Sequence, residues 1–157
     1  MNSLHATASS GSPLGLVAGG GSFPMLVAEN AVQSGRRVIA AGFHGHTDMP
    51  LEQHADSFRL FKLGQFNRLI RFFKSHGVRE LCFGGAINKP KALEIRPDWR
   101  AFRILFSLKS KGDDALFKAI FAELEREGFT MIQAASLVPS LYATPGVYTP
   151  LAPSVEI

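Results

Sequence analysis

The sequence has few of the residues and patterns that mark secreted, cysteine-ligated or membrane-spanning proteins. Cys82 is the only cysteine in 157 residues, which excludes a disulfide framework and a zinc site built from cysteines, and it fits a reducing cytosol. Its apolar neighbours in ELCFGG predict a buried packing residue rather than a nucleophile. No apolar run approaches the about 18 residues of a membrane span, and MNSLHATASSGSP has neither region of a signal peptide. We therefore expect a soluble cytoplasmic protein.

The excess of positive charge is modest, with a formal net charge of +4. It favours anionic partners such as phosphates, nucleic acid or lipid headgroups, without choosing between them. Hydrophobic residues make up 46% of the chain, which is long enough to bury one core. We expect residues 1–13 to be a disordered tail and residues 14–150 to form one domain.

The body of the chain alternates short apolar runs with helix-like segments. We expect strands at 14–19, 37–43, 57–63, 78–87 and 129–135, and helices at 24–34, 64–77, 97–109 and 112–128. Strands that alternate with helices of this length favour a parallel sheet with helices on both faces. The predicted fold is α/β, a Rossmann-like three-layer sandwich with about five parallel strands in the order 3-2-1-4-5.

Two glycine clusters follow the strands expected at the switch point of this sheet, the first and the fourth. AGGGSFP follows the first strand and FGGAINKP follows the fourth. Open parallel sheets bind ligands beyond the carboxyl ends of their strands at this point. Bare backbone allows close approach, and the start of the helix opened by Pro24 offers N–H groups to an anion. We predict a phosphate site, and the alternative is that Gly19–Gly21 form only a tight turn.

The glycine run departs from the established phosphate fingerprints. Gly19-x-Gly21-x-x-Pro24 has proline where the dinucleotide fingerprint has its third glycine, and it is not a P-loop. Asp48 lies only loosely where a ribose-binding acid would be expected. A NAD(P)-dependent oxidoreductase domain and a stand-alone nucleotide- or lipid-binding module both stay open as alternatives.

Asp113 and Asp114 in KSKGDDAL admit two interpretations. They could be a metal-ligand or acid/base pair, or Asp113 could cap a helix whose dipole Asp114 complements. The spacing favours the cap, and consecutive helical residues point about 100° apart, so we do not expect both carboxylates to reach one ion. Lys111 could neutralise a diphosphate or be solvated, whereas Asn88 and Lys89 follow the fourth strand, where such sheets bind ligands.

Four segments together resemble a known family: LGLVAGGGSFPMLVAENA, GQFNRLIRFFKSHGVRELCFGGAINKP, RPDWRAF and KGDDALFKAIFAELEREGF. Their order and spacing resemble the amino-terminal domain of the two-domain UDP-2,3-diacylglucosamine pyrophosphatases of lipid A synthesis, found in many Gram-negative bacteria. The resemblance runs from about residue 14 to residue 154. It implies hydrolysis of UDP-2,3-diacylglucosamine to 2,3-diacylglucosamine 1-phosphate and UMP, by water attack on a phosphorus with a divalent metal, Mg²⁺ or Mn²⁺.

The resemblance also implies that this chain is one half of an enzyme. The family has a second domain after APS, whereas this sequence stops at APSVEI. We therefore expect residues 151–157 to begin a linker to a C-terminal catalytic domain that holds the catalytic aspartate and the metal. No catalytic residue and no metal ligand are expected here, and the chain alone should be inactive. It would supply one side of the substrate cleft, comprising Gly19, Gly20, Gly21, Ser22, Gln65, Gly84, Gly85, Asn88, Lys89, Lys111, Gly112, Asp113 and Asp114.

The partners implied are UDP-diacylglucosamine or its lipid product and the chain's own C-terminal domain, with no nucleic acid. Peripheral contact with the inner membrane is a further expectation. It rests on Arg68, Arg71 and Lys74, which lie on one flank of the expected helix that follows Gln65.

Overall fold

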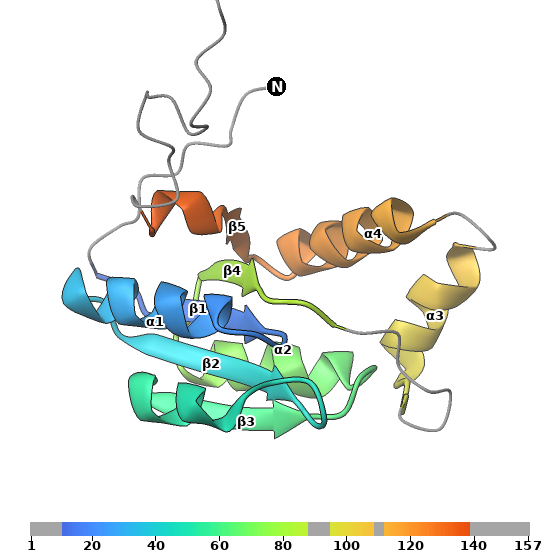
Figure 1. Cartoon of the computed structure of the whole chain (residues 1–157). Coiled ribbons are helices and arrows are strands. Elements are labelled where there is room, and N and C mark those ends of the chain that lie inside the picture. The colour runs from blue at the N-terminus through green and yellow to red at the C-terminus, as the bar shows by residue number, and fades with distance from the viewer. Residues whose placement is uncertain (1–10, 88–94, 109–111, 139–157) are drawn as a thin grey trace, which may run out of the picture.

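The computed structural model describes residues 11–87, 95–108 and 112–138. Parallel strands and helices alternate along this part of the chain (Figure 1). The strands are β1 (Leu14–Ala18), β2 (Val38–Phe43), β3 (Ser57–Phe61), β4 (Glu80–Gly84) and β5 (Thr130–Ile132). The helices are α1 (Phe23–Gln33), α2 (Phe66–Ser75), α3 (Trp99–Ser107) and α4 (Asp113–Arg126), with short 3₁₀ helices η1 (Met49–His54) and η3 (Ala134–Ser136).

The strand order is β3-β2-β1-β4-β5 and every pairing is parallel, which confirms the predicted topology. β1 lies in the middle, where Leu14 pairs with Val38 on one side and with Glu80 on the other. Every residue of β1 and β2 is buried, as expected for a parallel sheet covered on both faces. The order reverses between β1 and β4, so the switch point lies where it was predicted.

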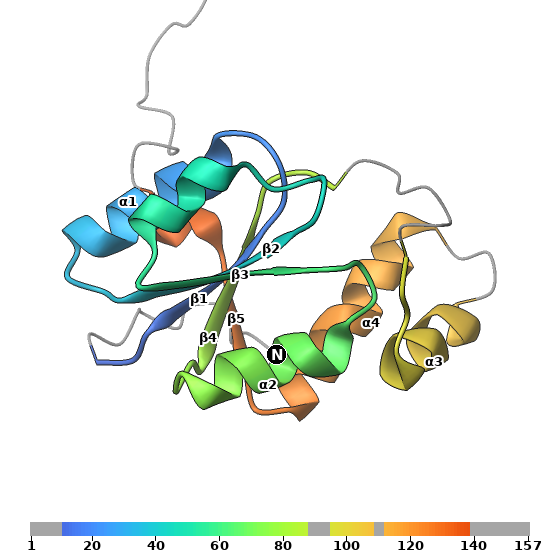
Figure 2. The same ribbon diagram turned by 90° about the horizontal axis from the view of Figure 1, so that it is seen from below.

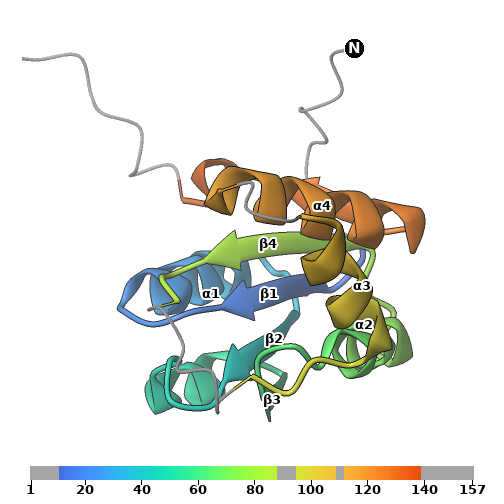
Figure 3. The same cartoon turned by 90° about the vertical axis from the view of Figure 1, so that its right-hand side faces the viewer.

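Helices cover both faces of the sheet, and Figure 2 shows the resulting three layers. Val38 and Ala40 of β2 pack in the core on the α1 side, whereas Ile39 and Ala41 pack in the core on the α2 and α4 side. This alternation follows from the two-residue period of a strand. α3 lies on the same side of the sheet as α2 and α4 and packs against both (Figure 3).

The helix ends follow the predicted signals. Gly35, Gly77 and Gly128 follow α1, α2 and α4 with φ of +79°, +72° and +96°, conformations that glycine adopts readily. Asp98 caps α3, because its Oδ1 accepts a hydrogen bond from the Ala101 N–H at 2.9 Å. The other oxygen of the same carboxylate accepts from the Asn67 N–H at 2.6 Å in the first turn of α2. One side chain thus joins the starts of two helices.

Several boundaries were predicted incorrectly. β3, β4 and β5 are shorter than the predicted strands, and η1 and η3 were not predicted. The N-cap of α4 is Gly112 rather than Asp113, which is the first residue of the helix. The expected linker, and residues 1–10 of the expected tail, lie outside the described residues.

Cys82 is buried in the sheet, where desolvation raises the pKa of its thiol to about 12. The thiolate that a nucleophile requires is therefore disfavoured, as the prediction of a packing role requires. None of the helices in the described ranges combines the length and apolar composition needed to cross a bilayer.

Candidate functional site

The loops that follow β1 and β4 meet at the carboxyl edge of the sheet. The Gly20 N–H donates to the carbonyl oxygen of Ala86 at 2.7 Å, and the Ala86 N–H donates back to the Gly20 carbonyl at 3.2 Å. The Gly19 N–H donates to the Gly84 carbonyl at 2.8 Å. The two glycine clusters therefore lie together, as predicted, and are hydrogen-bonded directly to each other.

Three of these glycines are required by close backbone packing. A Cβ atom would lie 2.6 Å from the Ala86 carbonyl oxygen at Gly19, 2.5 Å from the His46 carbonyl oxygen at Gly20, and 2.7 Å from the Gly20 carbonyl oxygen at Gly85. Real Cβ atoms do not approach so closely, so a side chain at any of the three would move a loop. The tight-turn alternative thus accounts for much of the bare backbone.

Gly21 differs from its neighbours because it faces open space. Its φ is +89°, and a Cβ atom built on it would meet no atom within 4 Å. At this position glycine is required by the backbone conformation and not by crowding. Among the glycines of the run, Gly21 is therefore the one with room beside it for a ligand.

The loop after β2 brings an acidic side chain to Gly21. Thr47 Oγ1 donates to the Ala18 carbonyl at 2.6 Å and accepts from the Phe43 N–H at 2.8 Å, which ties this loop to β1 and β2. Asp48 follows, and its Oδ2 accepts a hydrogen bond from the Gly21 N–H at 2.9 Å. The sequence did not predict this contact, because Asp48 lies 27 residues from Gly21.

A cavity of about 270 Å³ lies between these two loops. It is lined by Gly19, Gly21, Ser22, Pro24, Met25, Thr47, Asp48, Pro50 and Leu51. Ser22 is the N-cap of α1 and makes no side-chain capping bond, and the first N–H groups of any helix lack intrahelical partners. The cavity thus combines the N-terminus of α1, which favours an anion, with the Asp48 carboxylate. That carboxylate already accepts the hydrogen bond of the Gly21 N–H.

The other predicted site residues are distributed over several places. Gln65 is the N-cap of α2 and lines a different groove, described below. Gly112 has φ of +24° and precedes α4, in whose first turn Asp114 is exposed. Asn88, Lys89 and Lys111 lie outside the described residues. Among the predicted site residues that the structure describes, those grouped together are Gly19, Gly20, Gly21, Ser22, Gly84 and Gly85.

Aromatic side chains extend from the carboxyl end of β4 along α4. The Phe83 ring lies 5.0 Å from that of Phe121, which lies 6.2 Å from that of Phe117, measured between centroids. Phe117 is 50% exposed. Gly84 follows Phe83 directly, so this row provides apolar surface close to the meeting point of the glycine loops.

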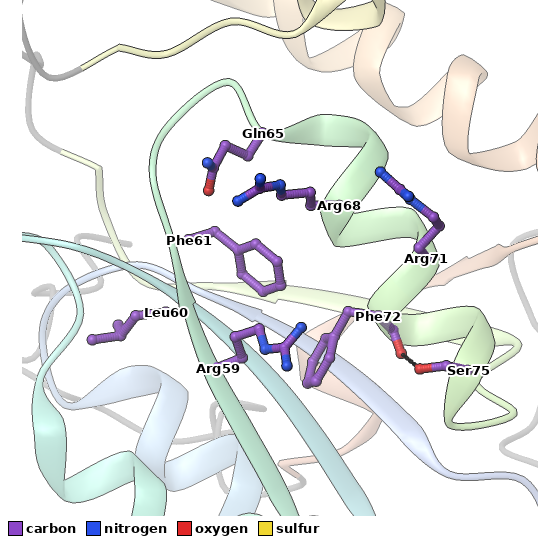
Figure 4. Close-up of a pocket in the computed structure, with 8 residues that line it drawn as sticks. All are labelled: Arg59, Leu60, Phe61, Gln65, Arg68, Arg71, Phe72 and Ser75. Carbon is purple, nitrogen blue, oxygen red and sulfur yellow. Dashed lines mark hydrogen bonds between the residues drawn. The ribbon is translucent and has the colours of Figure 1, made fainter.

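An open groove of about 620 Å³ runs between β3 and α2 (Figure 4). It is lined by Arg59, Leu60, Phe61, Gln65, Arg68, Arg71, Phe72 and Ser75. β3 is one of the two edge strands of the sheet, so this larger groove lies at the sheet's side rather than at the switch point. The sequence indicated the two arginines of α2 but gave no sign that Arg59 would join them.

Within residues 11–87, 95–108 and 112–138, no three histidine, cysteine, aspartate or glutamate side chains come together in a way that could hold a metal ion. Of the residues that the structure describes, Asp48 is the one acidic residue that lines the cavity beside Gly21. A Mg²⁺ or Mn²⁺ site uses carboxylates with retained waters. The described residues do not fit such an ion.

The chain resembles known proteins over most of its length. Residues 13–141 match the family described as LpxI N-terminal domain. The UDP-2,3-diacylglucosamine pyrophosphatase LpxI of Caulobacter vibrioides is 28% identical over an alignment of 146 residues, and the match covers 91% of this chain and 51% of that protein. The chain thus spans about half the length of this curated relative.

A solved structure of UDP-glucose 4-epimerase from Stenotrophomonas maltophila, with bound NAD and formylated UDP-arabinopyranose, has a similar fold. The TM-score is 0.51 at 11% identity, over 78% of this chain and 36% of that one. At this identity the likeness supports the Rossmann-like fold alone. The family match, by contrast, extends through all the strands and helices described above, and it confirms the resemblance found in the sequence. The chain belongs to the LpxI N-terminal domain family.

Proposed function

We propose that this chain is the substrate-binding half of a UDP-2,3-diacylglucosamine pyrophosphatase of lipid A synthesis. The complete enzyme would hydrolyse its substrate to 2,3-diacylglucosamine 1-phosphate and UMP. The observation that carries the proposal is the family match over residues 13–141, together with a pyrophosphatase relative of which this chain covers 51%.

The cavity beside Gly21 supports the part of the proposal that concerns binding of the nucleotide. It lies at the carboxyl edge of the sheet, between the loops that follow β1 and β2 and beside the switch point, where sheets of this order bind ligands, and the start of α1 favours phosphate oxygens. Gly21 N–H and the first turn of α1 would bind the diphosphate, and Asp48 would turn to accept hydrogen bonds from ribose hydroxyls. The substrate-binding set is that predicted from the sequence, extended by Asp48.

The aromatic row beside β4 supports the part of the proposal that concerns binding of the acyl chains. Phe117 and Phe121 present apolar surface next to the loop that contains Gly84 and Gly85. A diacylated sugar has to place its acyl chains against apolar side chains once its diphosphate is bound. We assign this row to the acyl side of the cleft.

A divalent metal would come from the second domain, because the described residues do not fit one. When bound, such a metal polarises the phosphoryl oxygen and orients water. The residues described here would bind and position the substrate, and they would not move a proton or attack phosphorus. The enzyme would work in the cytoplasm at the inner face of the inner membrane.

The test compares this chain with the same chain extended by its natural downstream sequence. We expect the extended protein to release UMP with Mg²⁺ or Mn²⁺, and this chain alone to release none above the buffer rate. UMP release by this chain alone, abolished by Asp113→Asn or Asp114→Asn but not by Glu52→Gln, would place the chemistry in this half and refute the proposal.

A second candidate function is nicotinamide dinucleotide binding. Asp48 favours it, because an acid after the second strand beside the glycine loop resembles the ribose contact of such sites. Proline at position 24 opposes it, because the third glycine of the fingerprint is missing. Titration of UDP, UMP and NADH against the chain separates the two, and NADH binding without UDP binding would favour the oxidoreductase.

A further inference from the structure

α3 presents its largest apolar side chains to solvent. Trp99, Phe102 and Phe106 are three and four residues apart, and their rings stack with centroids 5.9 and 6.0 Å apart. Their exposed fractions are 74%, 48% and 63%. A surface helix of a globular protein normally turns its apolar face inward. A contiguous exposed aromatic stripe of this kind indicates a surface that binds something.

Ion pairs hold α3 in this orientation. Arg100 Nη1 donates to Glu123 Oε1 at 2.8 Å and to Glu127 Oε1 at 2.5 Å, and Arg103 Nη2 donates to Glu123 Oε1 at 3.2 Å. Glu123 belongs to α4, and Glu127 is the C-cap residue of the same helix. The polar side of α3 is therefore bound to α4, and turning the aromatic stripe inward would break these pairs.

The groove beside α2 holds cations without matching anions. Among the described residues, Arg59, Arg68 and Arg71 form no ion pair with a carboxylate. The Arg59 guanidinium lies 5.5 Å from the centroid of the Phe72 ring, which holds it at the groove (Figure 4). Lys74 was predicted to lie on the same flank of α2 as Arg68 and Arg71. It instead pairs with Glu127, with Nζ and Oε2 2.5 Å apart. The unneutralised charge of the groove thus comes from its three arginines.

Asn67 links α2 with α3. Its carbonyl oxygen accepts from Arg71 Nε, its Oδ1 accepts from Arg100 Nε at 2.8 Å, and its N–H donates to Asp98, the residue before Trp99. α2 and α3 lie on the same side of the sheet (Figure 2) and contact each other. α2, which carries two of the arginines, and α3, which carries the aromatic rings, are therefore neighbouring helices on one side of the sheet.

We propose that this α2–α3 surface, formed by Arg59, Arg68, Arg71, Trp99, Phe102 and Phe106, docks on the headgroup region of an anionic phospholipid bilayer. Tryptophan and phenylalanine enter the membrane interface, and arginines meet lipid phosphates. The inference rests on the proposed function in one respect, because a diacylated substrate reaches the enzyme from a bilayer.

Charge complementarity selects a bilayer over the other possible occupants. An apolar protein surface would cover the aromatic stripe but leave three arginines without anions. A second copy of this chain, with its net charge of +4, would bring like charges together. An anionic bilayer supplies phosphates and an apolar boundary at once, which matches both halves of the surface.

Trp99 provides a direct test because it is the only tryptophan in the chain. The chain is mixed with vesicles of phosphatidylglycerol and phosphatidylcholine in equal parts, or of phosphatidylcholine alone. We expect a blue shift of Trp99 emission, protection from acrylamide and quenching by brominated acyl chains with the anionic vesicles only. Salt should weaken the association, because the arginine contribution is electrostatic.

Matched variants separate the two halves of the surface. Arg68→Gln/Arg71→Gln should weaken binding to anionic vesicles about 25-fold, about fivefold for each arginine. Arg37→Gln/Arg79→Gln changes the charge equally at exposed positions before β2 and β4 and should leave binding nearly unchanged. Phe102→Ser should weaken binding at constant charge, whereas Val32→Ser, at an exposed apolar position on α1, should not.

Several results would overturn the proposal. The first is no spectral change with anionic vesicles, and the second is equal binding to phosphatidylcholine alone. The third is an equal loss of vesicle affinity in Arg68→Gln/Arg71→Gln and in Arg37→Gln/Arg79→Gln. Trp99 protected from acrylamide before lipid is added, with a dimer in sedimentation, would assign the stripe to a second copy. Because the vesicles contain no substrate, their binding is independent of UMP release from detergent-dispersed substrate, so each proposal can fail without the other.

Discussion

The backbone N–H of Gly21 donates a hydrogen bond to Oδ2 of Asp48 at 2.9 Å, so a carboxylate of the chain itself occupies the N–H that would bind a phosphate. Asp48→Asn should raise the affinity for inorganic pyrophosphate about two- to fivefold, the effect of removing an exposed like charge. Calorimetric titration measures it. Glu52→Gln, which changes the charge equally on η1, is the control, and unchanged or weaker pyrophosphate binding by Asp48→Asn would contradict this site.

Gly20 and Gly21 should respond differently to the same substitution. Gly20→Asn places a Cβ atom 2.5 Å from the His46 carbonyl oxygen, so the loop after β2 has to move. Gly21→Asn meets open space at a positive φ that asparagine tolerates. Urea unfolding should give a cost of about 2–3 kcal/mol for Gly20→Asn and about 1 kcal/mol or less for Gly21→Asn. Equal costs would mean that the loops are not packed as described.

The fold could be predicted because its signals are local. Glycines at positions 35, 77 and 128 end helices through their own backbone conformation. Asp98 caps α3 by accepting a hydrogen bond from the N–H of Ala101, three residues later. Alternating apolar runs and helical stripes then leave few topologies for a parallel sheet. The end of β5 was placed too late because FTMIQAA carries an apolar pattern that does not distinguish a strand from the turn of η3.

The site was predicted less completely because its contacts are distant in sequence. The topology alone predicts that the two glycine clusters meet. Which of their glycines face open space depends on the loop after β2, which covers Gly20. Asp48 reaches Gly21 only because Thr47 binds the end of β1. Arg59 lies on the same face of β3 as Phe61 and reaches the Phe72 ring, but how close the two come depends on how α2 packs on the sheet. No periodicity or motif encodes these distances.

Arg36 and Glu80 form a buried ion pair at the amino edge of the sheet, with Nη2 and Oε2 2.6 Å apart. Nε and Nη1 of Arg36 are buried without a hydrogen-bond partner among the described residues. Glu80→Gln should therefore cost about 3–5 kcal/mol in denaturant unfolding, because it leaves a buried cation uncompensated. The exposed neighbour provides the comparison, since Arg79→Gln should change stability by no more than about 0.5 kcal/mol.

Replacing both partners tests whether the charge itself is the cause. Arg36→Met/Glu80→Met removes the cation and the anion together and keeps apolar volume in the core. This double variant should be more stable than Glu80→Gln. If it is equally unstable, the loss comes from packing around Glu80 and not from an unpaired charge.

Glu127 joins α2, α3 and α4 and should make stability depend on pH. Hydrogen bonds from Lys74, and then from Arg100, hold the pKa of its carboxyl below the ordinary value of 4.5. A carboxyl with a lowered folded-state pKa stabilises the fold above its unfolded pKa, and this contribution is lost as the pH falls through the folded value. The loss should therefore appear below about pH 4.5.

Thermal unfolding of Glu127→Gln, measured from about pH 7 to about pH 3, tests this dependence. At neutral pH the variant should unfold a few degrees below the wild type, because a partly exposed ion pair contributes about 1 kcal/mol at most. The two proteins should converge below pH 4.5, where the wild-type carboxylate becomes protonated and no longer attracts Lys74 and Arg100. Glu125→Gln removes an exposed carboxylate of the same helix that pairs with no cation in the described residues, and it should follow the wild-type curve. A difference between wild type and Glu127→Gln that persists unchanged at acid pH would show that Glu127 stabilises the three helices through packing rather than through charge.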